Sequence, residues 1–265
     1  MRFTAFKRLL NRAHVLLQGR LSCFNLVLSF VKDRTGLEIG GPSQVFREWY
    51  RPLPIYDAVG SLDNCDFSRS TTWASHSEVY VFSRHKAPGK NIFCDGSDLA
   101  VIANQKYDFV LSSHNLEHFA NPVKALKEWQ RITRPGGVLI LVLPDHAKTF
   151  DHQREPTSVT HMLEDFDRDT QEDDLTHLPE ILREHDLEMD PGAGSPEEFR
   201  ERSQNNFANR CLHHHVFDQN NSRELLTRTG MDVIAVETAL PFHLVLVARV
   251  KAHEATLATT AGPTW

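Results

Sequence analysis

The sequence predicts an α/β protein whose mostly parallel sheet is buried on both faces. Short apolar runs alternate with segments of helical periodicity through the first half of the chain. These runs are continuously apolar rather than alternating, as expected of parallel strands that helices cover on both sides. The 265 residues, of which 40% are apolar, are enough for one large domain that carries a substantial insertion.

Five strands and one well-marked helix are predicted in the first half. Pro122 begins a helix that continues to Arg134, because apolar residues recur in it at helical spacing. Gly136 and Gly137 separate this helix from the fifth strand, which Pro144 ends. The predicted strands are a first that ends at 37–39, then 56–62, 91–94, 107–113 and 138–143.

The second half begins with a break in this alternation. Residues 145–218 are rich in Asp and Glu and show helical patterns without strands, which predicts an inserted helical cap for the substrate. A helix over 222–230 then ends at a C-cap glycine. The strands predicted over 231–240 and 242–250 are joined only by Pro241, so we expect this last pair to be antiparallel.

Both ends of the chain differ from this predicted domain, which spans residues 33–250. Residues 1–32 carry six Lys or Arg and no acidic residue, and their apolar residues indicate a basic amphipathic helix. Such a helix would pack on the domain or rest on an anionic membrane surface. Arg20 interrupts the apolar run, which argues against a signal peptide. Residues 251–265 are small and polar and predict a disordered tail.

Charge and cysteine usage exclude some function classes. The net charge of −6 argues against a protein built mainly to hold nucleic acid. The four cysteines are scattered and form no CxxC pair, so we expect reduced thiols and a cytoplasmic protein.

Polar residues follow the predicted strands where a ligand would bind. An open parallel sheet binds ligands beyond the carboxyl ends of its strands. Glycines in a turn at that edge let the backbone approach a ligand closely. The residues at this edge are Glu38, Gly40, Gly41, Asp63, Asp95, Gly96, Ser97, Ser113 and His114.

Four segments, in this order, resemble the class I S-adenosylmethionine-dependent methyltransferases: 37–43, 95–99, 107–118 and 134–139. The similarity is greatest to the branch that includes menaquinone and ubiquinone biosynthesis enzymes, and it covers about residues 35–145 and 211–250. It implies a Rossmann-like sandwich with a mostly parallel seven-stranded sheet and an antiparallel final strand. It also implies methyl transfer from S-adenosylmethionine. The chain departs from the pattern at Pro42, where the family usually has another glycine.

The resemblance implies roles for the residues after the first two strands. Gly40 and Gly41 would approach the methionine part of the cofactor, and Glu38 would order its amino group. Asp63 would accept hydrogen bonds from the ribose hydroxyls, with Asp57 as the alternative. Glu38 could instead be a structural carboxylate at a strand end.

The residues after the third and fourth strands would bind the rest of the cofactor. Asp95 would receive the adenine amino group, with Gly96 and Ser97 lining the ring, unless this segment is a plain turn. Ser113 and His114 would lie near the sulfonium. The neighbouring Glu117–His118 pair fits a helix start better than a catalytic pair.

The histidines suggest how an acceptor would be activated. An acceptor hydroxyl needs a base, and a histidine titrates near working pH; His114, His152 and His214 are the candidates. We therefore expect O-methylation of a small polar acceptor, such as a sugar or saccharide conjugate. Methylation of an amine is the alternative, as is a catalytically silent binding module. An NAD-type dehydrogenase would need a fuller G-x-G-x-x-G turn.

A metal site in the insertion is the other possibility that its histidines raise. His177, Glu180 and His185, together with the run that starts at His213, could supply imidazole and carboxylate ligands. Residues 173–180 also fit a helix start, with Pro179 and Glu180 in the first turn. We prefer the helix start, so no metal is predicted.

Overall fold

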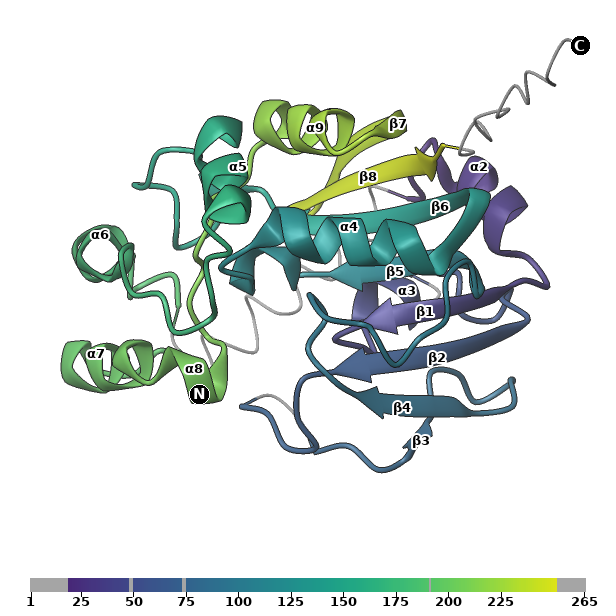
Figure 1. Cartoon of the computed structure of the whole chain (residues 1–265), viewed down its shortest axis with the longest axis horizontal. Helices are drawn as coiled ribbons and strands as arrows, with labels where there is room; N and C mark the ends of the chain where they lie inside the picture. Colours follow the sequence, from purple (N-terminus) through teal and green to yellow (C-terminus); the bar gives the residue numbers. More distant parts are fainter. Residues whose placement is uncertain (1–18, 48–49, 73–74, 191, 252–265) are drawn as a thin grey trace, which may run out of the picture.

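An eight-stranded mixed sheet forms the centre of the molecule (Figure 1). The computed structural model describes residues 19–47, 50–72, 75–190 and 192–251. The spatial order of the strands is β3-β4-β2-β1-β5-β6-β8-β7. The strands are β1 Thr35–Ile39, β2 Ser61–Asp66, β3 Val79–Tyr80, β4 Gly89–Phe93, β5 Tyr107–Ser113, β6 Thr133–Pro144, β7 Met231–Ala239 and β8 His243–Val250.

The directions of the strands confirm the predicted fold class. Strands β4, β2, β1, β5 and β6 are parallel to their neighbours in this series, and β8 is antiparallel to both β6 and β7. The sheet has one strand more than predicted, because the short β3 pairs with β4 at the edge in the antiparallel sense. The carboxyl ends of the central strands therefore share one edge.

Helices cover both faces of the sheet. Strand β6 shows this directly, because its consecutive residues Leu139 and Ile140 point to opposite faces and belong to two different apolar clusters. The first cluster contains Trp129 of α4, and the second contains Val27 of α2. The helices α4 (Pro122–Ile132), α5 (Val159–Asp167) and α9 (Gln219–Arg228) contribute to the first cluster, and α2 (Phe24–Val31) and α3 (Gln44–Arg47) to the second.

The predicted amino-terminal helix is described only in part. Residues 1–18 lie outside the described residues, as do residues 252–265 of the predicted tail. The described part contains α2, which is eight residues long and buries Val27 and Val31. The carboxylate of Glu237 in β7 accepts hydrogen bonds from the Ser22 amide and hydroxyl and from the Cys23 amide. These bonds tie the start of α2 to the sheet.

The prediction of a second strand over 56–62 was wrong. Residues 56–58 form a turn, and β2 begins only at Ser61. Tyr56 and Val59 are buried, but in the loop that packs with α2 and α3 rather than in the sheet. Asp63 consequently lies within β2, paired with Leu37, and does not follow the strand.

The insertion between β6 and α9 is helical. No strand occurs in residues 145–190 or 192–218, the parts of it that the structure describes. It contains η2 (His146–Lys148), α5, α6 (Leu178–Glu184), α7 (Pro196–Gln204) and α8 (Asn206–Asn209). In Figure 1 the arrowheads of β1, β2 and β4 point toward α6, α7 and α8. The insertion thus lies at the edge where a ligand is expected. None of the helices in the described parts of the chain is long and apolar enough to cross a membrane.

Candidate cofactor and acceptor site

The turn after β1 is held close to the end of β5. Gly40 has a φ of +74°, which favours glycine, and a Cβ at this position would lie 2.1 Å from the Asn115 side-chain nitrogen. The Gly40 amide donates to the Cys65 carbonyl at 2.9 Å, and the Gly41 amide donates to Asn64 Oδ1 at 2.8 Å. The turn is therefore fixed to the end of β2 as well.

Glu38 anchors this turn from below. Its Oε1 accepts hydrogen bonds from the Ser43 amide at 3.2 Å and the Ser43 hydroxyl at 2.6 Å. Its Oε2 accepts from the hydroxyls of Tyr56 at 2.6 Å and Tyr80 at 2.5 Å. Burial raises the pKa of the Glu38 carboxyl, which has no exposed surface. Because its oxygens are used inside the protein, the geometry fits a structural role for Glu38 and not a contact with the cofactor's amino group.

The carboxylates predicted to bind the ribose are not at the ligand-binding edge. Asp63 accepts hydrogen bonds from the Lys90 amide at 3.0 Å and the Tyr107 hydroxyl at 2.9 Å, within the sheet. Asp57, the alternative, lies before β2 and accepts a hydrogen bond from Ser83. Both are therefore displaced from the site because the second strand begins later than predicted.

Asp66 occupies the position predicted for Asp63. It is the last residue of β2 and is next to Cys65, whose carbonyl accepts from the Gly40 amide. Its Oδ2 lies 3.2 Å from His76 Nε2, and burial raises the pKa of its carboxyl. The sequence signal for it was a carboxylate that directly follows the apolar Cys65. That signal was missed because the strand was placed too early.

Asp95, Gly96 and Ser97 form a tight turn after β4. Asp95 Oδ1 accepts hydrogen bonds from the Ser97 amide at 2.8 Å and the Ser97 hydroxyl at 2.7 Å. The Gly96 carbonyl accepts from the Trp129 indole at 2.9 Å, and a Cβ on Gly96 would lie 2.8 Å from the Phe119 ring. The turn uses only one oxygen of the Asp95 carboxylate, so Oδ2 is left for another partner.

Arg210 of the insertion contacts that second oxygen. Its guanidinium lies 3.2 Å from Asp95 Oδ2 and 2.9 Å from Glu172 Oε2, and 5.4 Å from the centre of the Phe67 ring. Arg210 starts a stretch, residues 210–216, that we call the connecting segment because it leads from α8 back toward the sheet. The insertion thus reaches the ends of both β2 and β4, which local sequence patterns did not indicate.

His114 lies at the mouth of the site, after Ser113 ends β5. It is partly exposed and its φ is +51°. Its Nε2 lies 2.7 Å from His243 Nδ1, and its Nδ1 lies 3.7 Å from Glu117 Oε1. Burial lowers the pKa of both histidines, that of His114 well below its usual value, so both are neutral at neutral pH. A neutral imidazole is able to accept a proton.

Glu117 is a buried carboxyl group beside this histidine. The residue is 1% exposed, and neither carboxyl oxygen has a hydrogen-bond partner among the described residues. Burial raises the pKa of Glu117 to about 7. Glu117 and His118 are the last two residues of a short 3-10 helix, Leu116–His118. The burial of the carboxyl group was not foreseen.

The raised pKa of Glu117 predicts how the free energy of unfolding depends on pH. The folded chain keeps a proton on Glu117 that the unfolded chain releases near the ordinary glutamate pKa of 4.5, so this contribution to stability is fully present at low pH. It is lost as pH rises through about 7. Glu117→Gln should therefore become more stable relative to the native chain by about 3 kcal/mol between pH ~4.5 and ~8. Urea unfolding across this range measures the difference; Glu224→Gln, at an exposed site, is the control. An unchanged difference would contradict the burial argument.

A second acid–base pair comes from the insertion. His213 Nδ1 lies 2.5 Å from Asp151 Oδ2, and Arg154 lies 3.0 Å from Asp151 Oδ1. Burial opposes both charges, but their attraction outweighs it: the pKa of Asp151 is lowered and that of His213 is raised. The His213 ring packs against His118 at 4.7 Å between ring centres. The pair therefore lies beside the start of the Leu116–His118 helix.

The other two candidate bases have partners within the insertion. His152 is exposed, and its Nδ1 lies 3.1 Å from the Thr149 carbonyl. His214 is buried, and its Nε2 lies 2.9 Å from the Asn206 amide nitrogen. The structure therefore does not group either residue with His114.

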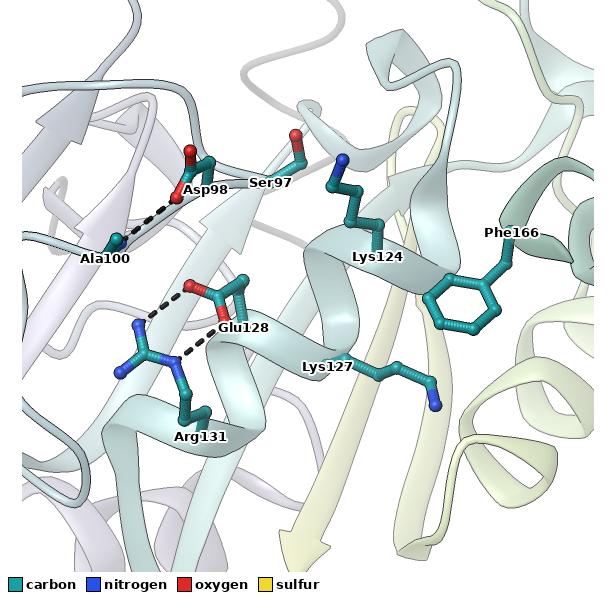
Figure 2. Close-up of a pocket in the computed structure, with 8 residues that line it drawn as sticks. All are labelled: Ser97, Asp98, Ala100, Lys124, Lys127, Glu128, Arg131 and Phe166. Atoms are coloured by element: carbon teal, nitrogen blue, oxygen red, sulfur yellow. Dashed lines mark hydrogen bonds and ion pairs between the residues drawn. The ribbon is translucent and has the colours of Figure 1, made fainter. Parts of the chain in front are cut away.

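A shallow hollow lies beside the strand-end site (Figure 2). Of the predicted cofactor residues, only Ser97 lines it. Two of its lining residues, Glu128 and Arg131, form an ion pair at 2.7 Å. The lining residues are Ser97, Asp98, Ala100, Lys124, Lys127, Glu128, Arg131 and Phe166. Half of them belong to α4, so this hollow is not the edge to which Gly40 and His114 belong.

The chain is similar to known methyltransferases. Residues 66–141 match a family model described as a methyltransferase domain, and this stretch spans the ends of β2, β4 and β5. No curated protein matches the sequence significantly.

Solved methyltransferase structures are also similar to this chain. A SAM dependent methyltransferase from Aquifex aeolicus has 11% identity and a TM-score of 0.44, with 85% of this chain and 87% of that chain covered. The S-adenosylmethionine dependent methyltransferase from Mesorhizobium loti has 12% identity and a TM-score of 0.47, with 86% of this chain and 95% of that chain covered. The 1,6-didemethyltoxoflavin-N1-methyltransferase of Burkholderia thailandensis was solved with S-adenosylhomocysteine. It has 10% identity and a TM-score of 0.46, with 87% of this chain and 79% of that chain covered.

The matched domain and the sheet order define the class of the protein. A mostly parallel sheet that ends in an antiparallel strand pair is the arrangement implied by the resemblance of the sequence. Residues 66–141 match a methyltransferase domain, and the chain resembles the class I S-adenosylmethionine-dependent methyltransferases in this domain and in its sheet order. It is an enzyme, and S-adenosylmethionine is its methyl donor.

Proposed function

We propose that the enzyme methylates a hydroxyl group of a small polar acceptor, with a sugar or saccharide conjugate as the first candidate. The observation that supports this is the group of proton acceptors at the end of β5. Neutral His114 lies beside Glu117, whose pKa is about 7, and the His213–Asp151 pair lies next to them. A hydroxyl must lose its proton as it is methylated, and the neutral His114 ring is suited to receive it.

The residues at the strand ends fit S-adenosylmethionine. The close approach of Gly40 to Asn115 leaves no room for a side chain, as expected of a backbone turn that lies against a ligand. We assign the ribose hydroxyls to Asp66 in place of Asp63, because an acceptor-only carboxylate at the end of β2 suits a diol. Asp95 Oδ2 would face the adenine amino group, and it would share that oxygen with Arg210. When bound, the cofactor supplies a methyl group on a positively charged sulfur.

The protein's part in the reaction is to align the acceptor and take its proton. His243 fixes one nitrogen of the His114 ring at 2.7 Å, which orients the ring. The other nitrogen faces Glu117 at 3.7 Å. We assign the base to His114: its Nδ1, which is beyond hydrogen-bond distance of Glu117, would take the proton of the acceptor hydroxyl. The ionised Glu117 would then stabilise the imidazolium that results, because a neighbouring carboxylate favours the charged form.

A methyl-transfer assay with labelled S-adenosylmethionine tests the proposal. The acceptors would be panels of sugars, nucleotide-sugars and amines, after calorimetry has established binding of S-adenosylhomocysteine. Transfer to hydroxyl acceptors is expected. Transfer to amines alone would overturn the acceptor class and leave the enzyme class standing. Cofactor binding without transfer to any acceptor would favour a catalytically silent module.

His114→Gln should lower kcat by about 100-fold or more, the usual worth of a general base. The affinity for S-adenosylhomocysteine should change by less than about threefold, because the proposed role concerns the acceptor. The fall of the rate at acid pH, where the His114 ring becomes protonated, should also disappear. His152→Gln is the matched control, since His152 is exposed and its contacts lie within the insertion. Equal losses in the two variants would contradict the assignment of the base.

A further inference from the structure

We propose that the insertion holds a structural zinc ion, bound by His161, Asp165, His177 and His215. One ligand atom from each of these four side chains lies within 4.8 Å of all the others. His161 and Asp165 are one turn apart on α5, His177 precedes α6, and His215 belongs to the connecting segment. This site is separate from the proposed methyl-transfer site and differs from the combination that the sequence suggested.

The distances between the ligand atoms match a tetrahedral zinc site. Zinc binds imidazole nitrogen and carboxylate oxygen at about 2.0–2.1 Å, so tetrahedral ligands lie about 3.3 Å apart. His161 Nε2 lies 3.0 Å from His177 Nε2 and 3.4 Å from Asp165 Oδ2. Asp165 Oδ2 lies 3.8 Å from His215 Nε2. These three distances are close to the expected length, so small side-chain adjustments are enough to close the site.

Asp165 Oδ2 is directed into this group without any other partner. The atom is buried and has no hydrogen-bond partner among the described residues. The rest of Asp165 is held in place: Oδ1 accepts the Thr170 hydroxyl at 3.1 Å, and its carbonyl accepts the Asn121 amide at 3.1 Å. An unpaired carboxylate oxygen in the protein interior is costly unless a cation neutralises it. A zinc ion would provide that cation.

Two of the imidazoles are enclosed by the protein: His215 is 1% exposed, and His177 is partly buried. The Nδ1 of His177 faces the Glu180 carboxylate at 3.9 Å, a position from which a carboxylate orients metal-bound histidines.

The ligand set favours zinc in a structural role. Three imidazoles and one carboxylate are typical zinc ligands, and four protein ligands leave no open position for a substrate. The ion would join α5, the start of α6 and the connecting segment. The His215 amide also lies 3.4 Å from the Glu117 carbonyl, so the ion would steady the part of the insertion that borders the proposed base.

Another group of possible ligands is less suitable. Glu117, His118 and His213 also have ligand atoms within 4.8 Å of one another. However, His213 Nδ1 is paired with Asp151 at 2.5 Å, and His118 Nδ1 is paired with the Leu212 carbonyl at 2.9 Å. In the His161 group one ligand nitrogen, His215 Nε2, also lies 3.3 Å from the Ala120 carbonyl. That group nevertheless has four ligands and an unpaired carboxylate oxygen, so we place the ion there.

Metal titration of the full chain tests the proposal. After treatment with a chelator, zinc would be added in a calorimeter, and cobalt would be added in a parallel absorption experiment. We expect one equivalent of zinc per chain and the visible bands of tetrahedral cobalt. His177→Ala and Asp165→Asn should each weaken zinc binding by at least about 100-fold. His152→Ala, a histidine of the same insertion outside the group, should bind zinc as the native chain does.

The variants also show which of the two groups of possible ligands binds the ion, and they distinguish loss of a ligand from loss of the fold. His177 is only partly buried, so His177→Ala is the variant expected to keep its fold, which circular dichroism checks. His213→Ala should retain the zinc. The proposal is overturned if the native chain binds no zinc up to about 100 µM. It is also overturned if binding survives in His177→Ala and Asp165→Asn, or is lost only in His213→Ala.

Discussion

Replacing Glu38 with alanine should lower the free energy of unfolding by about 3–5 kcal/mol. The change removes the acceptor of four internal hydrogen bonds, from Ser43, Tyr56 and Tyr80. Those donors would remain buried or partly buried without their partner, and each such donor costs about 1–3 kcal/mol. Urea unfolding followed by circular dichroism measures the loss. Glu78→Ala is the control, because Glu78 is exposed and should change stability by less than about 0.5 kcal/mol.

Glu38→Gln separates an anchoring role from a ligand contact. If Glu38 only holds the turn, this variant should lose stability. Its affinity for S-adenosylhomocysteine should then fall only because the turn is less well fixed. A contact with the cofactor's amino group would instead weaken binding with little loss of stability. A Glu38→Gln protein of native stability and weak binding would contradict the anchoring role.

Asp66→Asn should weaken S-adenosylhomocysteine binding by about 10–100-fold. Two hydrogen bonds from the ribose hydroxyls would lose a charged acceptor, and a hydrogen bond to a charged group contributes about 1.5–3 kcal/mol. Calorimetric titration measures the affinity directly. Thermal unfolding of the same variant is needed as well, because Asp66 Oδ2 also lies 3.2 Å from His76.

Asp63→Asn is the matched control on the same strand. Asp63 is bonded to the Lys90 amide and the Tyr107 hydroxyl inside the sheet, so its loss should affect stability more than binding. We expect its affinity for S-adenosylhomocysteine to stay within about threefold of the native value. If Asp63→Asn lost binding and Asp66→Asn kept it, the ribose would have to be assigned to Asp63 after all.

The sequence was sufficient to place the strands whose apolar residues are continuous. Strand β5 was predicted with its bounds, because every residue from Phe109 to Leu111 is buried between helices. The second strand was misplaced because Tyr56 and Val59 are equally apolar and equally buried, but in a loop. Local pattern alone does not distinguish burial in a loop from burial in a sheet, and the expectation that Asp63 follows the second strand came from this one error.

The site was predictable only where its residues follow strands directly. Gly40, Asp95 and His114 were placed correctly after strands β1, β4 and β5, because the ends of parallel strands meet at one edge. The contact of Arg210 with Asp95 was not foreseeable, since it joins residues from distant parts of the chain. The same is true of the proposed zinc ligands: His177 was noticed as a possible ligand, but the sequence paired it with His185, which stacks on Phe150 instead.

The connecting segment concentrates three contacts of the insertion in one short stretch of chain. Over seven residues it contacts Asp95 through Arg210, pairs with Asp151 through His213 and supplies His215 to the proposed metal group. Among the described residues of 181–204, none takes part in these three contacts. We therefore expect that exchanging residues 181–204 for another helical segment would leave these three contacts, and with them the proposed donor site, in place.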